Sequence, residues 1–348
     1  MPGGFHPPAA VILAWPKPNY TDPQAKGNEL LVITIICMTL STAAVLARLW
    51  VQIRHQKKLR VDDLMLVICM VPTIGIGALL ILTETKFRWF RHVWDLPRKD
   101  IVGRQYHSWI TQLLFILSTT FSKLSALLLY KRVVAGSLSP TSIFLVNTAI
   151  VGQSAYGIIF AFVGIFQCRP VNAYWLQFSY PHPYTEKFSC YYEGTVPLAN
   201  ACVSVVTDFL TALLPICLFL QMQIPKRDKY ALAAIFGVAF IVCIAGTVRT
   251  VIVHRIFYES YDNTWVSHNL WAWYYVETSL LVICSAIPPL RVYLKRIFGG
   301  SKSDSDHTPA VNTFHRKRAI DGSDPADSSN GRASTDSIVL HEVEHCKV

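Results

Sequence analysis

Residues 195–221 read TVPLANACVSVVTDFLTALLPICLFLQ, an apolar run in which Asp208 is the single charged residue. At ~1.5 Å per residue, a helix of this length extends about 40 Å, more than the ~30 Å hydrocarbon core of a bilayer. Six further runs of similar character lie at 29–53, 62–83, 106–130, 141–166, 230–255 and 267–290. Membrane β-strands would be about ten residues long and would alternate in polarity, unlike these runs. The sequence therefore predicts an all-α bundle of seven transmembrane helices.

The composition excludes two large classes of protein. Of the 348 residues, 52% are hydrophobic and only 16% are charged, yet the net charge is +10. Residues 1–300 carry 26 Lys and Arg against 14 Asp and Glu, whereas residues 301–348 carry 6 against 8. The basic excess thus belongs to the apolar part, while a nucleic-acid-binding protein places it on a water-facing surface. We expect a lipid bilayer as partner and no nucleic acid.

The chain divides into three parts by composition. Residues 1–28 are rich in Pro and Gly and lack the apolar core of a signal peptide. Residues 29–298 form the predicted membrane domain. Residues 299–348 are rich in Ser, Asp and Gly, which is typical of a disordered segment.

The orientation in the membrane depends on one unusual loop. Basic residues near the helix ends number twelve on one side and eleven on the other, and six of those eleven lie in residues 84–105. Without this loop the balance is twelve to five, which favours a cytosolic C-terminus. The sequon Asn19-Tyr20-Thr21 agrees, because glycosylation at Asn19 requires an N-terminus outside the cytosol. We expect a plasma-membrane protein with its N-terminus outside and its tail in the cytosol.

Two cysteines share one loop on the side of the N-terminus. Cys168 and Cys190 are candidates for a disulfide, because this side would be an oxidising compartment. Two free thiols, or a bridge from Cys190 to another outer cysteine, remain as alternatives.

Charged residues inside the apolar runs are expensive in a bilayer and face the bundle interior or a wet cavity. Asp208 lies near the middle of its run and shares a helix face with Asn200 and Ser204, at intervals of four residues. Arg249 and Glu277 are candidates to pair with each other or with Asp208. The predicted intramembrane polar layer consists of Asn200, Ser204, Asp208, Arg249 and Glu277. Such a layer is either a ligand or ion site, a switch, or a structural network between helices.

A second polar group is expected at the cytosolic side. Arg48 ends the first run, Asp62 and Asp63 open the second, and Lys123 is seven residues from the inner end of the third. A lysine at that depth can extend its amine towards the interface. We therefore predict an inner cluster of Arg48, Asp62, Asp63 and Lys123, acting as a structural latch or as a signalling switch.

The sequence lacks the residues that several kinds of chemistry require. A retinal Schiff base needs a lysine inside the seventh span, but residues 267–290 contain none and the next lysine is Lys295. No HExxH, P-loop or GxSxG motif is present. We therefore expect no cofactor, no metal and no enzymatic activity.

The loop at 84–105 combines six basic residues with four aromatic ones. Its segment His92-Val93-Trp94-Asp95 has the residue types to contact an anionic or aromatic ligand or a lipid headgroup. The alternative is simple anchoring at the interface by Trp89, Phe90 and Trp94.

The order and spacing of these residues resemble one family, the fungal rhodopsin-domain integral membrane proteins of the satratoxin-cluster type. In the first half the matching positions are Arg48, Asp62, Asp63, His92, Trp94, Asp95, Lys123, Ser125, Tyr130 and Arg132. In the second half they are Cys168, Pro170, Trp175, Cys190, Asn200, Asp208, Pro215, Lys229, Gly237, Arg249, Glu277 and Pro288. One departure is that Arg88 and Phe90 replace a Gly-x-Gly pair before the outer His.

The resemblance implies a receptor-like protein of fungi with seven helices and without retinal. It would bind an unknown extracellular small ligand and meet a cytosolic signalling partner. The alternatives are a transporter or ion-coupled carrier that uses Asp208, and a membrane-embedded biosynthetic enzyme.

Overall fold

The computed structural model describes residues 4–56, 60–135, 140–182, 184–220 and 226–298. Its long helices are α2 (Glu29–Val51), α3 (Val61–Leu82), α4 (Ile101–Ala135), α5 (Pro140–Ile165), α7 (Thr195–Leu220), α8 (Lys226–His254) and α9 (Asn263–Phe298). Within these ranges, seven helices are long and apolar enough to cross a membrane. The predicted fold class is confirmed. The tail at 299–348 lies outside the described residues.

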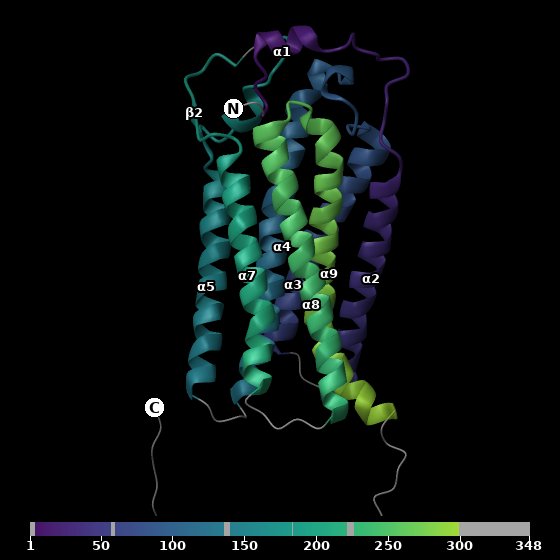
Figure 1. Cartoon of the computed structure of the whole chain (residues 1–348), viewed down its shortest axis with the longest axis vertical. Helices are drawn as coiled ribbons and strands as arrows, with labels where there is room; N and C mark the ends of the chain where they lie inside the picture. Colours follow the sequence, from purple (N-terminus) through teal and green to yellow (C-terminus); the bar gives the residue numbers. More distant parts are fainter. Residues whose placement is uncertain (1–3, 57–59, 136–139, 183, 221–225, 299–348) are drawn as a thin grey trace, which may run out of the picture. The chain divides into compact units, whose positions relative to one another are not determined.

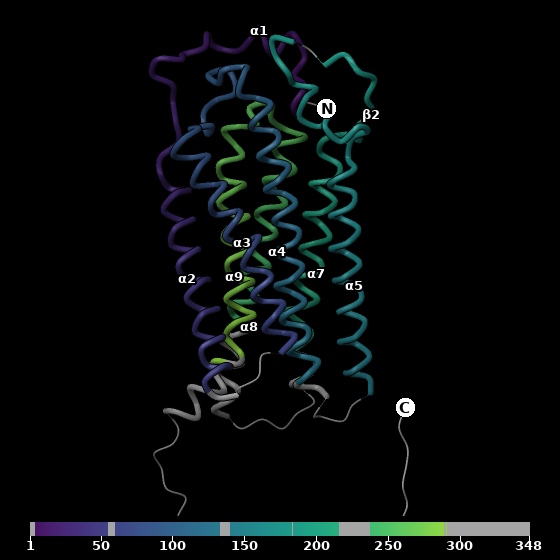
Figure 2. The backbone as a smooth tube through the Cα atoms, turned by 180° about the vertical axis from the view of Figure 1, so that it is seen from behind, coloured from purple at the N-terminus to yellow at the C-terminus, as the bar shows by residue number. Residues whose placement is uncertain are grey.

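The seven helices run side by side as one bundle (Figure 1). α4 contacts α3, α5, α7 and α9, and α8 packs between α7 and α9. α2 and α5 lie at opposite edges in both views (Figure 2) and are the least buried, whereas α4 and α9 are the most buried. Among the described residues, α4 and α9 carry more buried polar side chains than the other helices, and the edge helices present apolar residues outward. Exposed apolar side chains of α5 include Phe144, Val151, Ile158 and Phe162.

Three helices begin four or five residues before the apolar runs that predicted them. α4 begins at Ile101 instead of residue 106, α8 at Lys226 instead of 230, and α9 at Asn263 instead of 267. The reason is that helical hydrogen bonding continues past the hydrocarbon layer, where hydropathy no longer marks it. Short π-helical turns likewise extend α2, α3 and α8, at Gln52–Gln56, Thr83–Phe87 and Arg255–Glu259.

Local sequence explains some of the helix ends and contacts. At the start of α3 the Arg60 backbone N–H donates to Asp63 Oδ2 at 3.3 Å, which satisfies an amide at the helix N-terminus. α5 begins at Pro140, a residue suited to the first helical position because its missing N–H is not needed there. Gly157 on α5 lets that helix approach Thr120 of α4, because a Cβ there would lie 2.5 Å from Thr120 Cγ2.

One end of the bundle carries a cap, the end where Figure 1 places α1, β2 and the N-terminus. Its pieces are α1 (Ala9–Ala14), the 3₁₀ turns Val93–Asp95 and Arg98–Asp100, α6 (Ala173–Leu176), and the strands β1 (Cys168–Arg169) and β2 (Ser189–Cys190). β1 and β2 pair antiparallel, with Cys168 opposite Cys190. We call this the capped end and the other the opposite end.

Candidate functional site

The deepest charges of the bundle form two ion pairs. Lys123 Nζ on α4 lies 2.9 Å from Asp208 Oδ1 on α7, with each side chain 1% exposed. Lys123 also donates to the Ser204 carbonyl at 3.2 Å and to Thr207 Oγ1 at 2.8 Å. A further contact reaches Ser204 Oγ at 3.4 Å. Four oxygens thus surround the ammonium and compensate much of its lost hydration.

The position of Lys123 corrects the predicted inner cluster. The side chain does not extend to the interface, because Asp208 provides a carboxylate inside the bundle. Helical spacing showed that Lys123 faces inward but not which neighbouring helix it meets. Lys123 therefore belongs to the polar layer.

The second pair joins α8 to α9. Arg249 Nε lies 2.8 Å from Glu277 Oε2, and both side chains are fully buried. The Arg249 guanidinium also lies over the rings of Phe115 and Tyr274, at 4.8 and 5.1 Å from their centroids, a favourable cation–π position. Of the pairings that the sequence left open, the structure thus shows Arg249 with Glu277.

The two pairs meet at Gly246 of α8. A Cβ at this position would lie 3.4 Å from Asp208 Oδ2 and 3.5 Å from Glu277 Oε2. The glycine therefore lets both carboxylates approach the same helix face. The layer carries two cations and two anions, so it is formally neutral, and it joins α4, α7, α8 and α9.

Asn200 and Ser204 complete the polar layer on α7. Asn200 Oδ1 accepts a hydrogen bond from Tyr156 of α5 at 2.7 Å, which connects the edge helix to the layer. Asn200 Nδ2 has no acceptor among the described residues. The predicted face of Asn200, Ser204 and Asp208 is therefore turned into the bundle, with all three buried.

Arg48, Asp62 and Asp63 form a separate group, which we call the Arg48 cluster. Arg48 Nη2 lies 2.7 Å from Asp62 Oδ2, and Nε donates to Asp63 Oδ1 at 2.8 Å. Its third nitrogen, Nη1, donates to the carbonyl of Ser285 on α9. The Asp62 carbonyl also accepts from Ser125 of α4. One fully buried guanidinium thus holds α2, α3 and α9 together beside α4.

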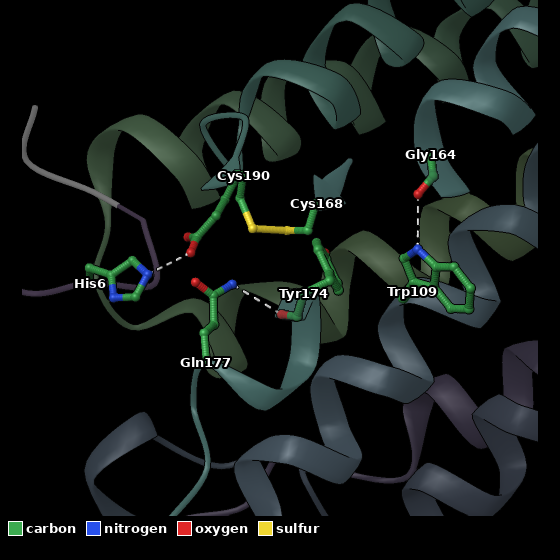
Figure 3. Close-up of a disulfide and its surroundings, with 8 residues drawn as sticks. His6, Trp109, Gly164, Cys168, Tyr174, Gln177 and Cys190 are labelled. Atoms are coloured by element: carbon green, nitrogen blue, oxygen red, sulfur yellow. Dashed lines mark hydrogen bonds and ion pairs between the residues drawn. A yellow bond between two sulfur atoms is a disulfide. The ribbon is translucent and has the colours of Figure 1, made fainter. Parts of the chain in front are cut away.

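The predicted disulfide is confirmed: Cys168 and Cys190 are bonded and join β1 to β2. Figure 3 shows the bond beside Tyr174, and farther away Trp109, whose Nε1 donates to the Gly164 carbonyl at 2.9 Å. Just after β2, Glu193 Oε1 lies 2.8 Å from His6 Nε2. The disulfide loop therefore anchors the N-terminal segment to the bundle.

The outer-loop residues singled out from the sequence hold the cap together. His92 stacks between Trp94 and Trp265, with ring centroids 4.5 and 4.1 Å away, and its Nδ1 pairs with Asp262. Asp95 Oδ1 accepts from the backbone N–H of Asn19 at 2.9 Å. The Asn19 side chain is exposed, and its Oδ1 accepts from Thr21. These contacts fix the N-terminal segment against the ends of α3 and α9.

A cavity lies beneath the cap, and we call it the capped-end cavity. Its polar lining comes from Thr83, Arg104, Gln105, His107, Ser108, Thr111, Asn263, Thr264 and Ser267. Its apolar lining comes from Phe5, Leu80, Trp89, Phe90, Ile256, Phe257, Leu270 and Trp271. Arg104 and Asn263 are not apparent from the sequence as site residues, because both precede the apolar runs.

A second cavity of about 50 Å³ adjoins the polar layer. Lys123 and Asp208 form one side of it, and Tyr130, Thr211 and Cys284 line it further. No group of three His, Cys, Asp or Glu side chains within the described ranges is arranged to hold a metal ion.

A family profile described as "Fungal rhodopsin domain" matches residues 47–296, which includes every residue of the polar layer and the Arg48 cluster. The chain belongs to the fungal rhodopsin domain family. The resemblance stated from the sequence is thereby confirmed.

Three curated fungal proteins are similar to parts of this chain. Satratoxin biosynthesis SC1 cluster protein 4 of Stachybotrys chartarum is 26% identical over 53% of this chain and 63% of its own length. A SAT4 family membrane protein of Emericella nidulans is 26% identical over 56% of this chain and 47% of its own length. Wortmanamides biosynthesis cluster protein C of Talaromyces wortmannii is 28% identical over 53% and 48%, respectively. The matched region thus spans between about half and under two thirds of these relatives.

Proposed function

We propose that this fungal rhodopsin-domain protein is a receptor-like, non-enzymatic signalling protein that works without retinal. A small extracellular ligand would act at the capped end, and a cytosolic partner would read the result at the opposite end. The polar layer would couple the two, because it joins four helices through charges that are costly to leave unpaired.

The arrangement at Gly246 carries this proposal. Both Asp208 Oδ2 and Glu277 Oε2 face that one position on α8, while their cations approach from α4 and from α8 itself. A small shift of α8 would change which carboxylate is nearer to Arg249. A layer with two alternative pairings is the kind of bistable element that converts a small displacement into a helix rearrangement.

A substitution at Asp208 tests the proposal. Asp208→Asn keeps the size of the side chain but removes the charge that holds Lys123, so ligand-dependent signalling should be lost in cells matched for surface abundance of the protein. The readout is the transcript profile of a fungal host that carries the wild-type chain, the variant or no copy. Asp22→Asn, an exposed residue of the N-terminal segment, is the matched control. An Asp208→Asn strain with the wild-type profile would exclude the layer as the switch.

The orientation is part of the proposal: the capped end lies outside the cell, at the plasma membrane. The disulfide beside it supports this placement, because disulfides persist in oxidising compartments. Glycan mapping provides the test. A glycan that is lost in both Asn19→Gln and Thr21→Ala places the capped end outside, whereas an unmodified Asn19 with a protease-accessible tail outside the cell reverses the assignment.

The cavity beside Lys123 and Asp208 favours a second candidate, a transporter or ion-coupled carrier. Such a protein would load its cargo or proton at the Asp208 carboxylate. Flux measurements in proteoliposomes separate this candidate from a receptor, because only the carrier would move an ion or solute across the bilayer in an Asp208-dependent way.

Two relatives are named for satratoxin and wortmanamide biosynthesis clusters, which favours a third candidate. In that case the protein would be a membrane-embedded biosynthetic enzyme. Deletion would then remove a metabolite and accumulate its precursor, and the phenotype would be corrected by adding the missing product, whereas a receptor defect would change transcript levels first.

A further inference from the structure

The capped-end cavity has a chemistry of its own. It holds about 80 Å³, room for a few water molecules but less than the ~150 Å³ that accommodates a benzene ring, so an aromatic ligand requires Phe5, one of its lining residues, to move aside. Aromatic rings form much of its wall, among them Trp89, Phe90 and Trp271. Such walls favour a small, flat apolar body.

The charge in the cavity is positive. Arg104 of α4 lines it, and no Asp or Glu is among its lining residues. Asp100 and Asp262 lie close enough to act on Arg104 electrostatically, yet neither comes within ion-pair distance in the described part of the chain. Asp262 is already engaged, because it accepts from the Val93 backbone N–H and pairs with His92. A guanidinium in this situation is suited to bind a carboxylate in a two-pronged geometry.

An uncompensated acceptor lies in the same wall. Asn263 is 4% exposed, and its Nδ2 donates to the Gly4 carbonyl at 2.7 Å. Its Oδ1 has no donor among the described residues. A buried amide oxygen without a partner costs stability, and a ligand hydroxyl or N–H would remove that cost. His107 Nε2, in the same cavity lining, also lacks a partner.

The N-terminal segment contributes to the wall of this cavity. Phe5 lines it, and the Phe5 backbone N–H donates to Glu193 Oε2 at 3.2 Å. The Gly4 N–H donates to the Ser260 carbonyl at 3.3 Å. Residues Gly4–His6, which we call the strap, are therefore anchored beside the cavity, and displacement of this strap with Phe5 would enlarge the cavity for a ligand.

We propose that the capped-end cavity binds a small aromatic acid: a carboxylate on Arg104, a ring among the aromatic walls, and a hydroxyl on Asn263. This inference deepens the proposed function by naming the ligand class at the capped end. Binding to purified protein involves no signalling step, so it can fail while the Asp208 experiment succeeds, and the reverse also holds.

Binding is measured by calorimetry on the full chain in phosphatidylcholine nanodiscs, which contain no anionic lipid to compete. The probe is 4-hydroxyphenylacetate, with its neutral amide and with phenylacetate as matched analogues. We expect saturable binding of the acid, with the amide weaker by about tenfold or more because the charge-assisted bonds to Arg104 are lost. Phenylacetate should bind several-fold more weakly, because Asn263 Oδ1 again lacks its donor.

Variants assign the effect to the two residues. Arg104→Gln should remove the preference for the acid over the amide, and Asn263→Ala the preference for the hydroxyl. Arg98→Gln, an exposed arginine outside the cavity lining, should change neither. Arg104→Lys, which keeps the charge, should keep part of the preference and serves if Arg104→Gln does not fold. The proposal is overturned if no probe binds saturably at millimolar concentration, or if acid and amide bind equally.

Discussion

Lys123 and Asp208, 85 positions apart in the sequence, form an ion pair of 2.9 Å that is almost completely sealed from solvent. In an apolar surrounding each charge is stable only because the other is present. This mutual dependence predicts how the pair responds when one member is removed.

Removing one charge should destabilise the protein far more than removing both. We expect Lys123→Met and Asp208→Leu each to lower the free energy of unfolding by about 3–5 kcal/mol, because each strands a buried charge. The double variant should recover most of that loss. Unfolding in mixed micelles measures the three variants, and additive losses in the double variant would show that the two residues do not act as a pair.

The Arg48 cluster should require a guanidinium and not just a positive charge. Arg48 donates from three nitrogens, to Asp62, Asp63 and the Ser285 carbonyl, and an ammonium cannot reproduce that fork. Arg48→Lys should therefore cost about 2–3 kcal/mol of unfolding free energy.

The matched control for this substitution is Arg132→Lys. Arg132 Nη1 lies 3.6 Å from Asp62, but its side chain is one-third exposed. This change should cost less than about 1 kcal/mol. Equal losses for the two variants would contradict a special role for Arg48.

The sequence predicted the helices well, because the length of an apolar run decides whether it can cross a bilayer. It predicted that Asp208, Arg249 and Glu277 face inward, since a bilayer penalises any other position. It placed Lys123 with the wrong partners, because helical periodicity gives the face of a helix but not the neighbour that the face meets. Lys123 pairs with Asp208 because α4 packs against α7, and the sequence of α4 alone does not reveal that packing.

The cap was the hardest part to predict. His92 and Asp95 were identified as noteworthy, but their partners Asp262 and Asn19 lie in segments without periodicity. Hydropathy places Arg104 in a loop, because the apolar run begins five residues after the start of α4. Only the disulfide could be predicted there, since Cys168 and Cys190 share one loop.

Loss of the disulfide should weaken the capped end. Cys168→Ser/Cys190→Ser frees the loop between β1 and β2, which should lower the unfolding free energy by about 3 kcal/mol in the chain-entropy estimate. The single variant Cys202→Ser is the control, because Cys202 is an exposed free cysteine on α7. Thermal unfolding with and without a reductant gives the measurement. The prediction would be contradicted if reduction of this bond left the thermal stability of the wild-type protein unchanged.

The strap beside the capped-end cavity should respond to pH. The hydrogen bond to Glu193 raises the pKa of His6 above its ordinary value of 6.5. A raised pKa in the folded state means that the stabilisation is fully present below pH 6.5 and is lost as the pH rises through the folded-state pKa. The effect should stay under about 1 kcal/mol, because the His6 side chain is mostly exposed.

Hydrogen exchange at Phe5 reports on the anchoring of the strap, since its N–H donates to Glu193. Exchange corrected for its intrinsic pH dependence should accelerate from pH 6 to pH 8 in the wild type. His6→Gln should remove this acceleration of exchange, because glutamine does not titrate. Protection of Phe5 that is constant over this range would contradict the assignment to His6.

Two glycines of α5 should respond oppositely to the same substitution. Gly152 is exposed and has nothing within 4 Å of a Cβ, so Gly152→Ala should be neutral or stabilising by up to about 1 kcal/mol through helix propensity. Gly157 is buried, and a Cβ there would lie 2.5 Å from Thr120 Cγ2 and 2.8 Å from Thr120 Oγ1. Gly157→Ala should therefore cost about 1–3 kcal/mol, since overpacking outweighs propensity.

A second-site change shows whether the overlap with Thr120 is the cause. Thr120→Ala removes both of the atoms that a Cβ at position 157 would strike most closely, although the Thr120 Cβ itself remains 3.1 Å away. The combination Gly157→Ala/Thr120→Ala should therefore recover part of the lost unfolding free energy, but not all of it. Because the overlap separates α4 from α5, the loss should also appear in hydrogen exchange at Tyr156, which reaches the polar layer through Asn200. Equal stabilities of Gly152→Ala and Gly157→Ala would mean that α5 is not held in close contact with α4.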